Sequence, residues 1–184
     1  MKKCLQCNEV FETDENVCPF CQSLEIEEVV EETDVSKDIS EEVKDVDFVV
    51  FKSALENGGS VRAINGEGMG AKLSRKEIDA LSELAKTYGG KGLAYIVINE
   101  DGTVKSPIAK FMSEAEFAAI LEKTGCEKGD VVFIIADTKN NSVLSTLGAV
   151  RCEAAKKLNI IGDGFNLLWI VEFPFFDWDE ETQQ

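Results

Sequence analysis

The sequence predicts an α+β fold, with a mixed β-sheet packed against helices and a small cysteine-bearing module at the amino-terminal end. Two observations lead to this prediction. Short apolar runs alternate with amphipathic helical patterns from residue 48 onward, and two Cys-x-x-Cys pairs stand within the first 21 residues. The 184 residues give room for one ordinary domain and a small accessory module. We divide the chain into four parts, 1–23, 24–47, 48–165 and 166–184.

The first part contains Cys4, Cys7, Cys18 and Cys21. Two tight turns with Cys-x2-Cys spacing can present four sulfurs in a tetrahedron, as zinc ribbons do. So short a segment cannot bury a core, and metal coordination would supply most of its folding free energy. Four thiolates fill the coordination shell and the chain has no histidine, so we expect a structural zinc ion. A redox dithiol pair or an iron site is the alternative.

The second part is strongly acidic. Eleven Asp or Glu stand against two Lys from residue 22 to residue 47, a local net charge of −9 out of −16 for the whole chain. We expect a solvated linker that tethers its neighbours. The overall charge argues against indiscriminate nucleic-acid binding, but residues 48–176 carry a net charge of only −1. An RNA-facing patch on residues 48–176 is therefore compatible with the charge distribution.

The third part begins with two predicted strands, 48–51 and 60–64. A capping box at 74–77 then starts a helix that ends near Gly89-Gly90. A buried strand follows at 93–98, then a turn, and the segment 107–111 is a candidate edge strand that begins with a proline.

A second capping box, at 113–116, starts a helix that stops at Gly125. The apolar run 131–136 predicts a central strand, and the longest helix is expected from 141 to 158. Six residues of that helix should face inward: Val143, Leu144, Leu147, Val150, Ala154 and Leu158. Cys126 and Cys152 are expected to be small buried residues.

Two features of the third part suggest contact with phosphates. The glycine-rich stretch 66–72 lacks the Gly-Lys-Ser/Thr of a nucleotide-binding loop and the third glycine of a dinucleotide fingerprint, so a plain turn is expected. The basic cluster Arg62, Lys72, Arg75 and Lys76 supplies the candidate RNA contacts, with a solvated helix start as the alternative.

Several segments in order carry a family resemblance. These are Phe51-Lys52, Gly59 to Ala63, Leu73 to Asp79, Lys91 to Ile96, Pro107 to Phe111, Gly129-Asp130, Ala136-Asp137, Leu147 to Arg151 and Leu168 to Pro174. They resemble the insertion called the GAD domain of bacterial aspartyl-tRNA synthetase, which is also found in a subunit of a tRNA-dependent amidotransferase. The resemblance covers about three quarters of the chain and implies an accessory role close to RNA.

The sequence contains none of the synthetase motifs that bind ATP, and no catalytic residue of that family has a counterpart here. We therefore expect a non-catalytic binding or adaptor module in translation-related biology. A subunit that discriminates tRNA in trans for a synthetase or amidotransferase is one alternative. A protein-binding regulatory module unrelated to tRNA is the other.

The fourth part is rich in aromatic residues and ends in acidic ones. Its candidate partner dock is formed by Trp169, Phe173, Phe175, Phe176 and Trp178. So much apolar surface should be covered, either by the chain's own domain or by self-association or a partner. No signal-peptide pattern and no apolar window of membrane-spanning length occurs, so a cytoplasmic protein without a membrane segment is expected.

Overall fold

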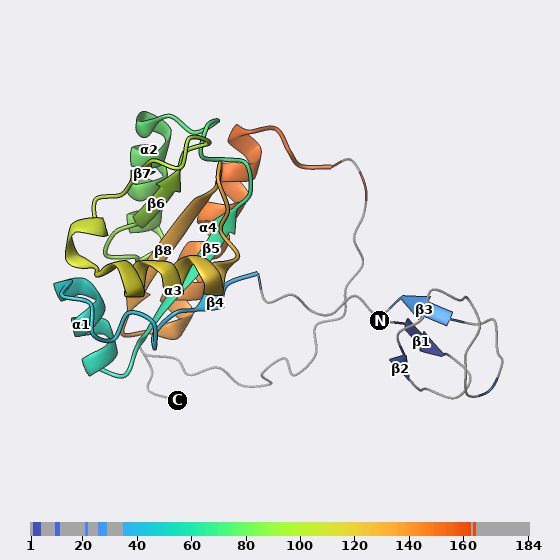
Figure 1. The fold of residues 1–184 in the computed structure, drawn as a ribbon, viewed down its shortest axis with the longest axis horizontal. Coiled ribbons are helices and arrows are strands. Elements are labelled where there is room, and N and C mark those ends of the chain that lie inside the picture. Colours follow the sequence, from blue (N-terminus) through green and yellow to red (C-terminus); the bar gives the residue numbers. More distant parts are fainter. Residues whose placement is uncertain are drawn as a thin grey trace, which may run out of the picture.

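The computed structural model describes residues 2–4, 10–11, 21, 26–28, 35–162 and 164. They form two sheets (Figure 1). The smaller sheet has the order β2-β1-β3 and contains β1 (Lys2–Cys4), β2 (Val10–Phe11) and β3 (Ile26–Glu28). The larger sheet has the order β4-β5-β8-β6-β7 and contains β4 (Lys37–Asp38), β5 (Ser60–Gly66), β6 (Ala94–Ile98), β7 (Val104–Lys105) and β8 (Val131–Asp137).

Helices cover both faces of the larger sheet (Figure 1). They are α1 (Val49–Glu56), α2 (Arg75–Thr87), α3 (Glu114–Thr124) and α4 (Asn140–Lys157). The α+β class is thus confirmed. The sheet is antiparallel at every described pairing, so the expectation of a mixed sheet was wrong. The long apolar runs arise because helices bury both faces of this antiparallel sheet.

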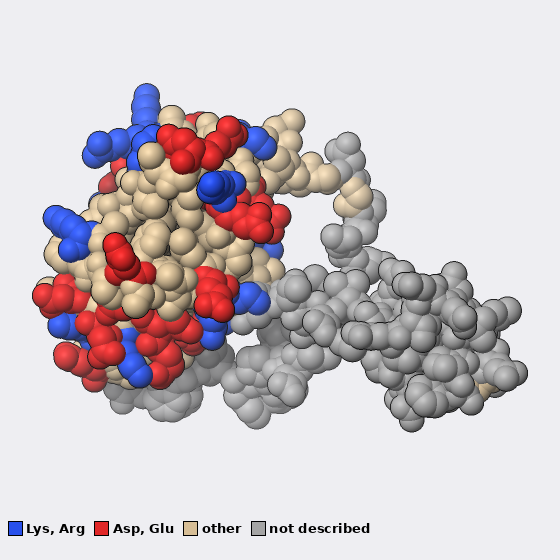
Figure 2. All heavy atoms as spheres, viewed as in Figure 1, with Lys and Arg blue, Asp and Glu red and all other residues tan. Residues whose placement is uncertain are grey.

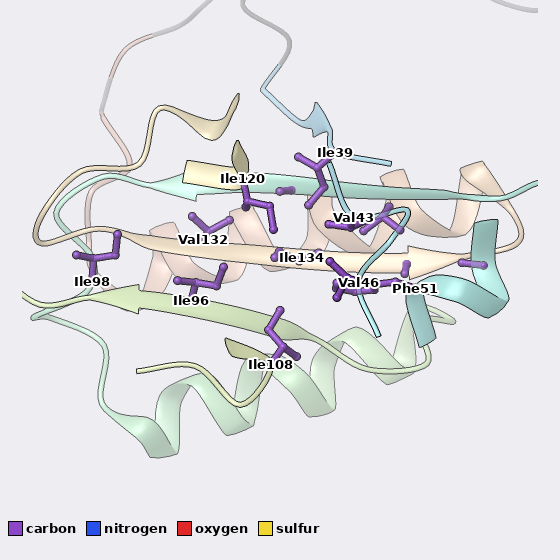
Figure 3. Close-up of a cluster of buried hydrophobic side chains, with 14 residues drawn as sticks. Ile39, Val43, Val46, Phe51, Ile96, Ile98, Ile108, Ile120, Val132 and Ile134 are labelled. Carbon is purple, nitrogen blue, oxygen red and sulfur yellow. The ribbon is translucent and has the colours of Figure 1, made fainter. Parts of the chain in front are cut away.

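Strand β8 is the centre of the domain, as predicted, and all seven of its residues are buried. Its side chains alternate between two cores. Val132 and Ile134 belong to the first core, which α1 and α3 cover, whereas Phe133 and Ile135 belong to the second core under α2 and α4. Figure 3 shows the first core, with side chains from the sheet and from residues 39–51 on one face. Because both sides of the strand are buried, Val131 to Ala136 are all apolar, and only Asp137 at its end is polar.

The acidic segment 24–47 was expected to be a linker, but part of it folds into the main domain. Ile39, Val43 and Val46 are fully buried in the first core, and β4 pairs with β5. The Ile39 amide donates to the Val61 carbonyl at 2.9 Å. Three apolar residues at spacings of four and three put one face of the turn on the core. Glu41 and Asp45 stay at the surface, whereas the Glu42 side chain is only 18% exposed and lies 3.2 Å from the Lys123 amine. Residues 37–46 are therefore part of the main domain.

Residues 49–51 form the start of helix α1, with Phe48 in an extended conformation just before it, and the strand predicted at 48–51 is absent. Only Phe51 and Ala54 of α1 are buried, three positions apart, whereas Val49 stays 77% exposed. This spacing fits one helical face rather than the alternation of a strand. Phe48 then packs edge-on against Phe51, with ring centroids 4.9 Å apart.

The segment 107–111 is also not a strand. Residues Ala109–Phe111 form a 3-10 turn, and the edge strand is β7 instead. The Ser106 hydroxyl donates to the Tyr95 carbonyl and accepts from the Ile108 amide, which turns the chain at Pro107. One further correction concerns α4, where the predicted inward residue Leu144 is 45% exposed.

Both capping boxes form as predicted. Ser74 accepts from the Glu77 amide at the start of α2, and Ser113 accepts from the Glu116 amide at the start of α3. Each glutamate in turn accepts from the amide of its serine at 2.7 Å. Gly125 ends α3 with a left-handed φ of 64°, as the sequence indicated.

Candidate nucleic-acid interface

Arg62, the first candidate RNA contact, is engaged within the chain. Its guanidinium donates to the Ser36 carbonyl at 3.0 Å and to the Ser36 hydroxyl at 3.2 Å, and it lies 3.7 Å from the Asp38 carboxylate. Its side chain is only 20% exposed. Arg62 therefore fastens β4 and the preceding residues to β5, and we assign it a structural role.

Lys72, Arg75 and Lys76 are exposed at the start of α2. Within the described part of the chain, Arg75 and Lys72 have no carboxylate within 4 Å. The amino-terminal end of α2 itself does not offer a free anion site, because Glu77 already accepts from the Ser74 amide and hydroxyl. Those hydrogen bonds lower the pKa of Glu77, so its carboxylate is charged at neutral pH.

Arg75 lies on a groove of about 590 Å³ between the start of α2 and strands β6 and β7. The groove also receives Lys105, whose position is fixed because Lys105 pairs with Val97 in the sheet. Its lining consists of Gly70, Ala71, Leu73, Ser74, Arg75, Ile78, Tyr95, Val97, Asn99, Lys105 and Pro107. The walls thus combine two cations with an aromatic ring, an amide and apolar side chains.

Sequence reasoning missed Lys105, Tyr95 and Asn99 as site residues. Tyr95 and Asn99 looked like parts of a buried strand and its turn, and Lys105 had no motif around it. Tyr95 and Asn99 share a face of the sheet through the alternation of β6, and Lys105 joins them because β7 pairs with β6. Of the four predicted RNA contacts, the structure places only Arg75 on the groove.

The glycine-rich stretch forms an internal turn, as predicted. The Gly68 amide donates to the Asp130 carboxylate at 2.8 Å, and the Gly70 amide donates to the Gly129 carbonyl at 2.8 Å. Gly68 has a φ of +61°, and a Cβ on Gly70 would lie 2.8 Å from the Asp130 carbonyl oxygen, so both positions require glycine. Since these amides already have acceptors, they cannot cradle a phosphate.

Asp130 is the residue that holds this turn in place. Besides Gly68, its carboxylate accepts from the Asn65 side chain and from the Glu127 amide, each at 2.9 Å. Burial tends to raise the pKa of Asp130, but the hydrogen bonds from Asn65, Glu127 and Gly68 outweigh burial and lower the pKa. Asp130 thereby positions Gly70 and Ala71, which form one wall of the groove.

Charges of both signs cover the domain. Figure 2 shows Lys and Arg projecting at the upper left of the visible face, next to Asp and Glu along its upper edge and right side, and a further group of Asp and Glu over its lower part.

The predicted zinc ligands lie mostly outside the described residues. Cys7 and Cys18 are outside, Cys4 is the last residue of β1, and Cys21 is exposed. Among side chains that the structure describes, no three Cys, Asp or Glu gather as a metal site requires. The pairing of β1 with β3 places Cys4 opposite Ile26, five positions after Cys21.

The candidate partner dock Trp169, Phe173, Phe175, Phe176 and Trp178 also lies outside the described residues. Cys126 is half-buried against the first core, and burial followed by the charge of Asp130 raises the pKa of its thiol to about 12. Cys152 is exposed on α4, so its expected burial was wrong. In the part of the chain that the structure describes, no helix has the length and apolar character to span a membrane.

The fold and groove define a small α+β domain with an antiparallel sheet between two helical layers and a cationic groove at one end. The family model of the GAD domain matches residues 51–147. The chain belongs to the GAD domain family, as the resemblance had implied.

Curated relatives are aspartate–tRNA ligases. The ligase of Ruminiclostridium cellulolyticum is 51% identical over 147 residues, which are 79% of this chain and 24% of the relative. The ligase of Agathobacter rectalis is 52% identical over 148 residues, 80% of this chain and 24% of the relative. The aspartate–tRNA(Asp/Asn) ligase of Lachnoclostridium phytofermentans is 50% identical over 146 residues, with 79% and 24% covered. The chain thus spans about a quarter of the length of these relatives.

Proposed function

We propose that this chain is a non-catalytic binding module of translation that contacts tRNA through the groove between α2 and β7. The observation that carries the proposal is the meeting of Arg75 and Lys105 on one groove, with no acidic residue in its lining. The similarity to aspartate–tRNA ligases supports tRNA as the nucleic acid. A partner synthetase or amidotransferase would present that tRNA to the groove.

Absence of catalysis is part of the proposal. The described residues offer neither a histidine nor an unengaged pair of buried acids for acid–base chemistry, since Asp130 is held by three donors. The cytoplasmic location expected from the sequence stays a prediction.

The test is tRNA binding by the purified chain at low and moderate salt, comparing wild type with the double variant Arg75→Glu/Lys105→Glu. Two charge reversals at the groove should lower the affinity at least tenfold, because each removes an attraction to phosphate and adds a repulsion. The control variant Lys44→Glu makes the same kind of change on the exposed turn that packs near α1. Equal losses in both would reject the groove, and no binding by wild type at low salt would favour a protein partner instead.

We also propose that Cys4, Cys7, Cys18 and Cys21 hold one structural zinc ion, whose chemistry would be to cross-link the amino-terminal strands. The spacing of the two Cys-x2-Cys pairs supports this donor set. Metal analysis of the purified chain should find one zinc per chain, lost in Cys7→Ser and retained in Cys152→Ser. Zinc retained in Cys7→Ser, or iron in place of zinc, would contradict the assignment.

A further inference from the structure

The groove offers a ligand apolar and aromatic contacts in addition to electrostatic attraction for phosphate. Its cations lie beside an apolar floor that includes Val97 and Ile78, and Tyr95 contributes the aromatic ring. Bases that are paired and stacked in an RNA duplex cannot reach such a floor, whereas an unpaired base can leave the stack and enter it. A volume of about 590 Å³ is sufficient for one nucleotide and too small for a helix of RNA.

We propose that the groove binds a single unpaired nucleotide within an RNA chain, with its base against Tyr95 and its phosphates at Arg75 and Lys105. This inference rests on the proposed function and adds the kind of RNA that the site selects. Aromatic rings in single-strand binding proteins stack on bases, and neighbouring cations follow the backbone. Here the ring and both cations line one groove, on β6, α2 and β7 respectively.

The polar side chains around the groove can bind a base edge on the Asn99 side and a phosphate on the Arg75 side. The Asn99 side chain donates to the Thr103 hydroxyl at 2.6 Å, so its amide is held in a fixed orientation at the β6 end of the groove. Glu77, two positions after Arg75 on α2, accepts hydrogen bonds from Ser74, and no ion pair joins it to Arg75 among the described residues. Arg75 is therefore available to an incoming phosphate. Lys105 lies near Asp101, where the hydrogen bonds from Thr103 and, more weakly, the charge of Lys105 lower the pKa of that exposed carboxyl, so a phosphate at Lys105 would compete with Asp101. Asn99 is positioned to bond a base edge.

Hydrogen bonds within the chain hold both walls of the groove in place. One wall is fixed by the hydrogen bond from the Gly70 amide to the Gly129 carbonyl and by the bonds to Asp130. The opposite wall is fixed by the pairing of Val97 with Lys105 and by the Ser106 hydroxyl bound to the Tyr95 carbonyl. A preformed site loses less conformational entropy when it binds its ligand.

The experiment uses the full zinc-loaded chain and four probes: a single-stranded RNA of ten nucleotides, a blunt duplex of ten base pairs, AMP and tRNA. The single strand should bind at least tenfold more tightly than the duplex or AMP. Tyr95→Leu should weaken single-strand binding about fivefold or more, since stacking of one base contributes about 1 to 3 kcal/mol. Tyr95→Phe keeps the ring and should bind within twofold of wild type, and thermal unfolding of both variants checks that they fold.

The outcomes separate this inference from the proposed function. If tRNA binds but the duplex binds as well as the single strand, or Tyr95→Phe loses as much as Tyr95→Leu, the unpaired nucleotide is rejected and tRNA binding stands. If AMP binds as tightly as the single strand, the groove is a site for free nucleotides and the inference is wrong. If none of the RNA probes binds, both proposals fail.

Discussion

Arg62 and Arg75 stand 13 positions apart in the sequence and looked alike as candidate RNA contacts, yet the fold uses them differently. Arg62 lies on a central part of the sheet, where Ser36 and Asp38 surround its guanidinium. Arg75 opens α2 at the edge of a groove, with no carboxylate within 4 Å among the described residues. The comparison teaches that a cation is a binding candidate only where the chain itself does not neutralise it.

The largest effect is expected at Asp130, which holds the wall of the groove on the Arg75 side. Asp130→Ala leaves three donors without their acceptor and should lower the free energy of unfolding by about 3 kcal/mol. Urea unfolding at neutral pH measures this loss. A loss below about 1 kcal/mol would mean that the turn does not depend on Asp130.

The same residue predicts a pH dependence. The pKa of Asp130 is lowered in the folded chain, so its stabilising contribution is complete above the unfolded value of 3.8 and is lost as the pH falls through the folded pKa. The stability difference between wild type and Asp130→Asn should therefore be largest between pH 5 and 7, on the order of 1 kcal/mol or more, and shrink below that unfolded value. Urea midpoints measured from pH 7 to pH 3 test this, and a difference that grows toward pH 3 would contradict it.

Arg62→Ala should cost about 2 kcal/mol of stability, because it removes two hydrogen bonds from a guanidinium and the ion pair with Asp38. Its tRNA affinity should stay within twofold of wild type. Arg75→Ala is the matched variant and should change stability by less than about 0.5 kcal/mol. Unfolding curves and binding isotherms of the two variants measure these changes. Equal losses of stability in both would contradict the distinction between Arg62 and Arg75.

Lys105→Ala should have a smaller effect, confined to binding. One phosphate contact fewer should reduce the slope of log affinity against log salt by about 0.7 to 0.9. Titrations of tRNA at several salt concentrations provide the slope. An unchanged slope would remove Lys105 from the interface.

The smallest effect is one of thiol reactivity. With a pKa of about 12, the Cys126 thiol is almost fully protonated at neutral pH, whereas Cys152 is exposed on α4. A mild alkylating reagent on the folded chain should modify Cys152 first and Cys126 only after unfolding. Mass spectrometry of digested samples measures the modification of each cysteine over time. Equal modification rates at Cys126 and Cys152 would contradict the burial of Cys126.

Local signals in the sequence were sufficient for most of the main domain. Both capping boxes, the left-handed Gly125 and the apolar run of β8 depend on neighbouring residues, and all of them appear in the structure. The helix at Val49 and the packing of Ile39 could not be predicted this way, since each depends on contacts with residues far along the chain. A high local charge concealed the three apolar residues of the acidic segment.

The groove could be predicted only in part, because it also depends on residues that are far apart in the sequence. Arg75 was found as a basic residue at a helix start, but Lys105 and Tyr95 come from strands whose pairing sequence alone did not specify. The two arginines could not be distinguished either, because the partners of Arg62 precede it by 24 and 26 positions in a segment expected to be solvated.

The most direct test of the groove is a nuclear magnetic resonance titration of the isotope-labelled full chain with tRNA. Binding at the groove should shift the amide signals of Gly70 to Arg75, Tyr95 and Lys105, and leave those of Ser36, Asp38 and Arg62 unchanged. Shifts centred on β4 and Arg62, with none at Arg75 and Lys105, would contradict the account.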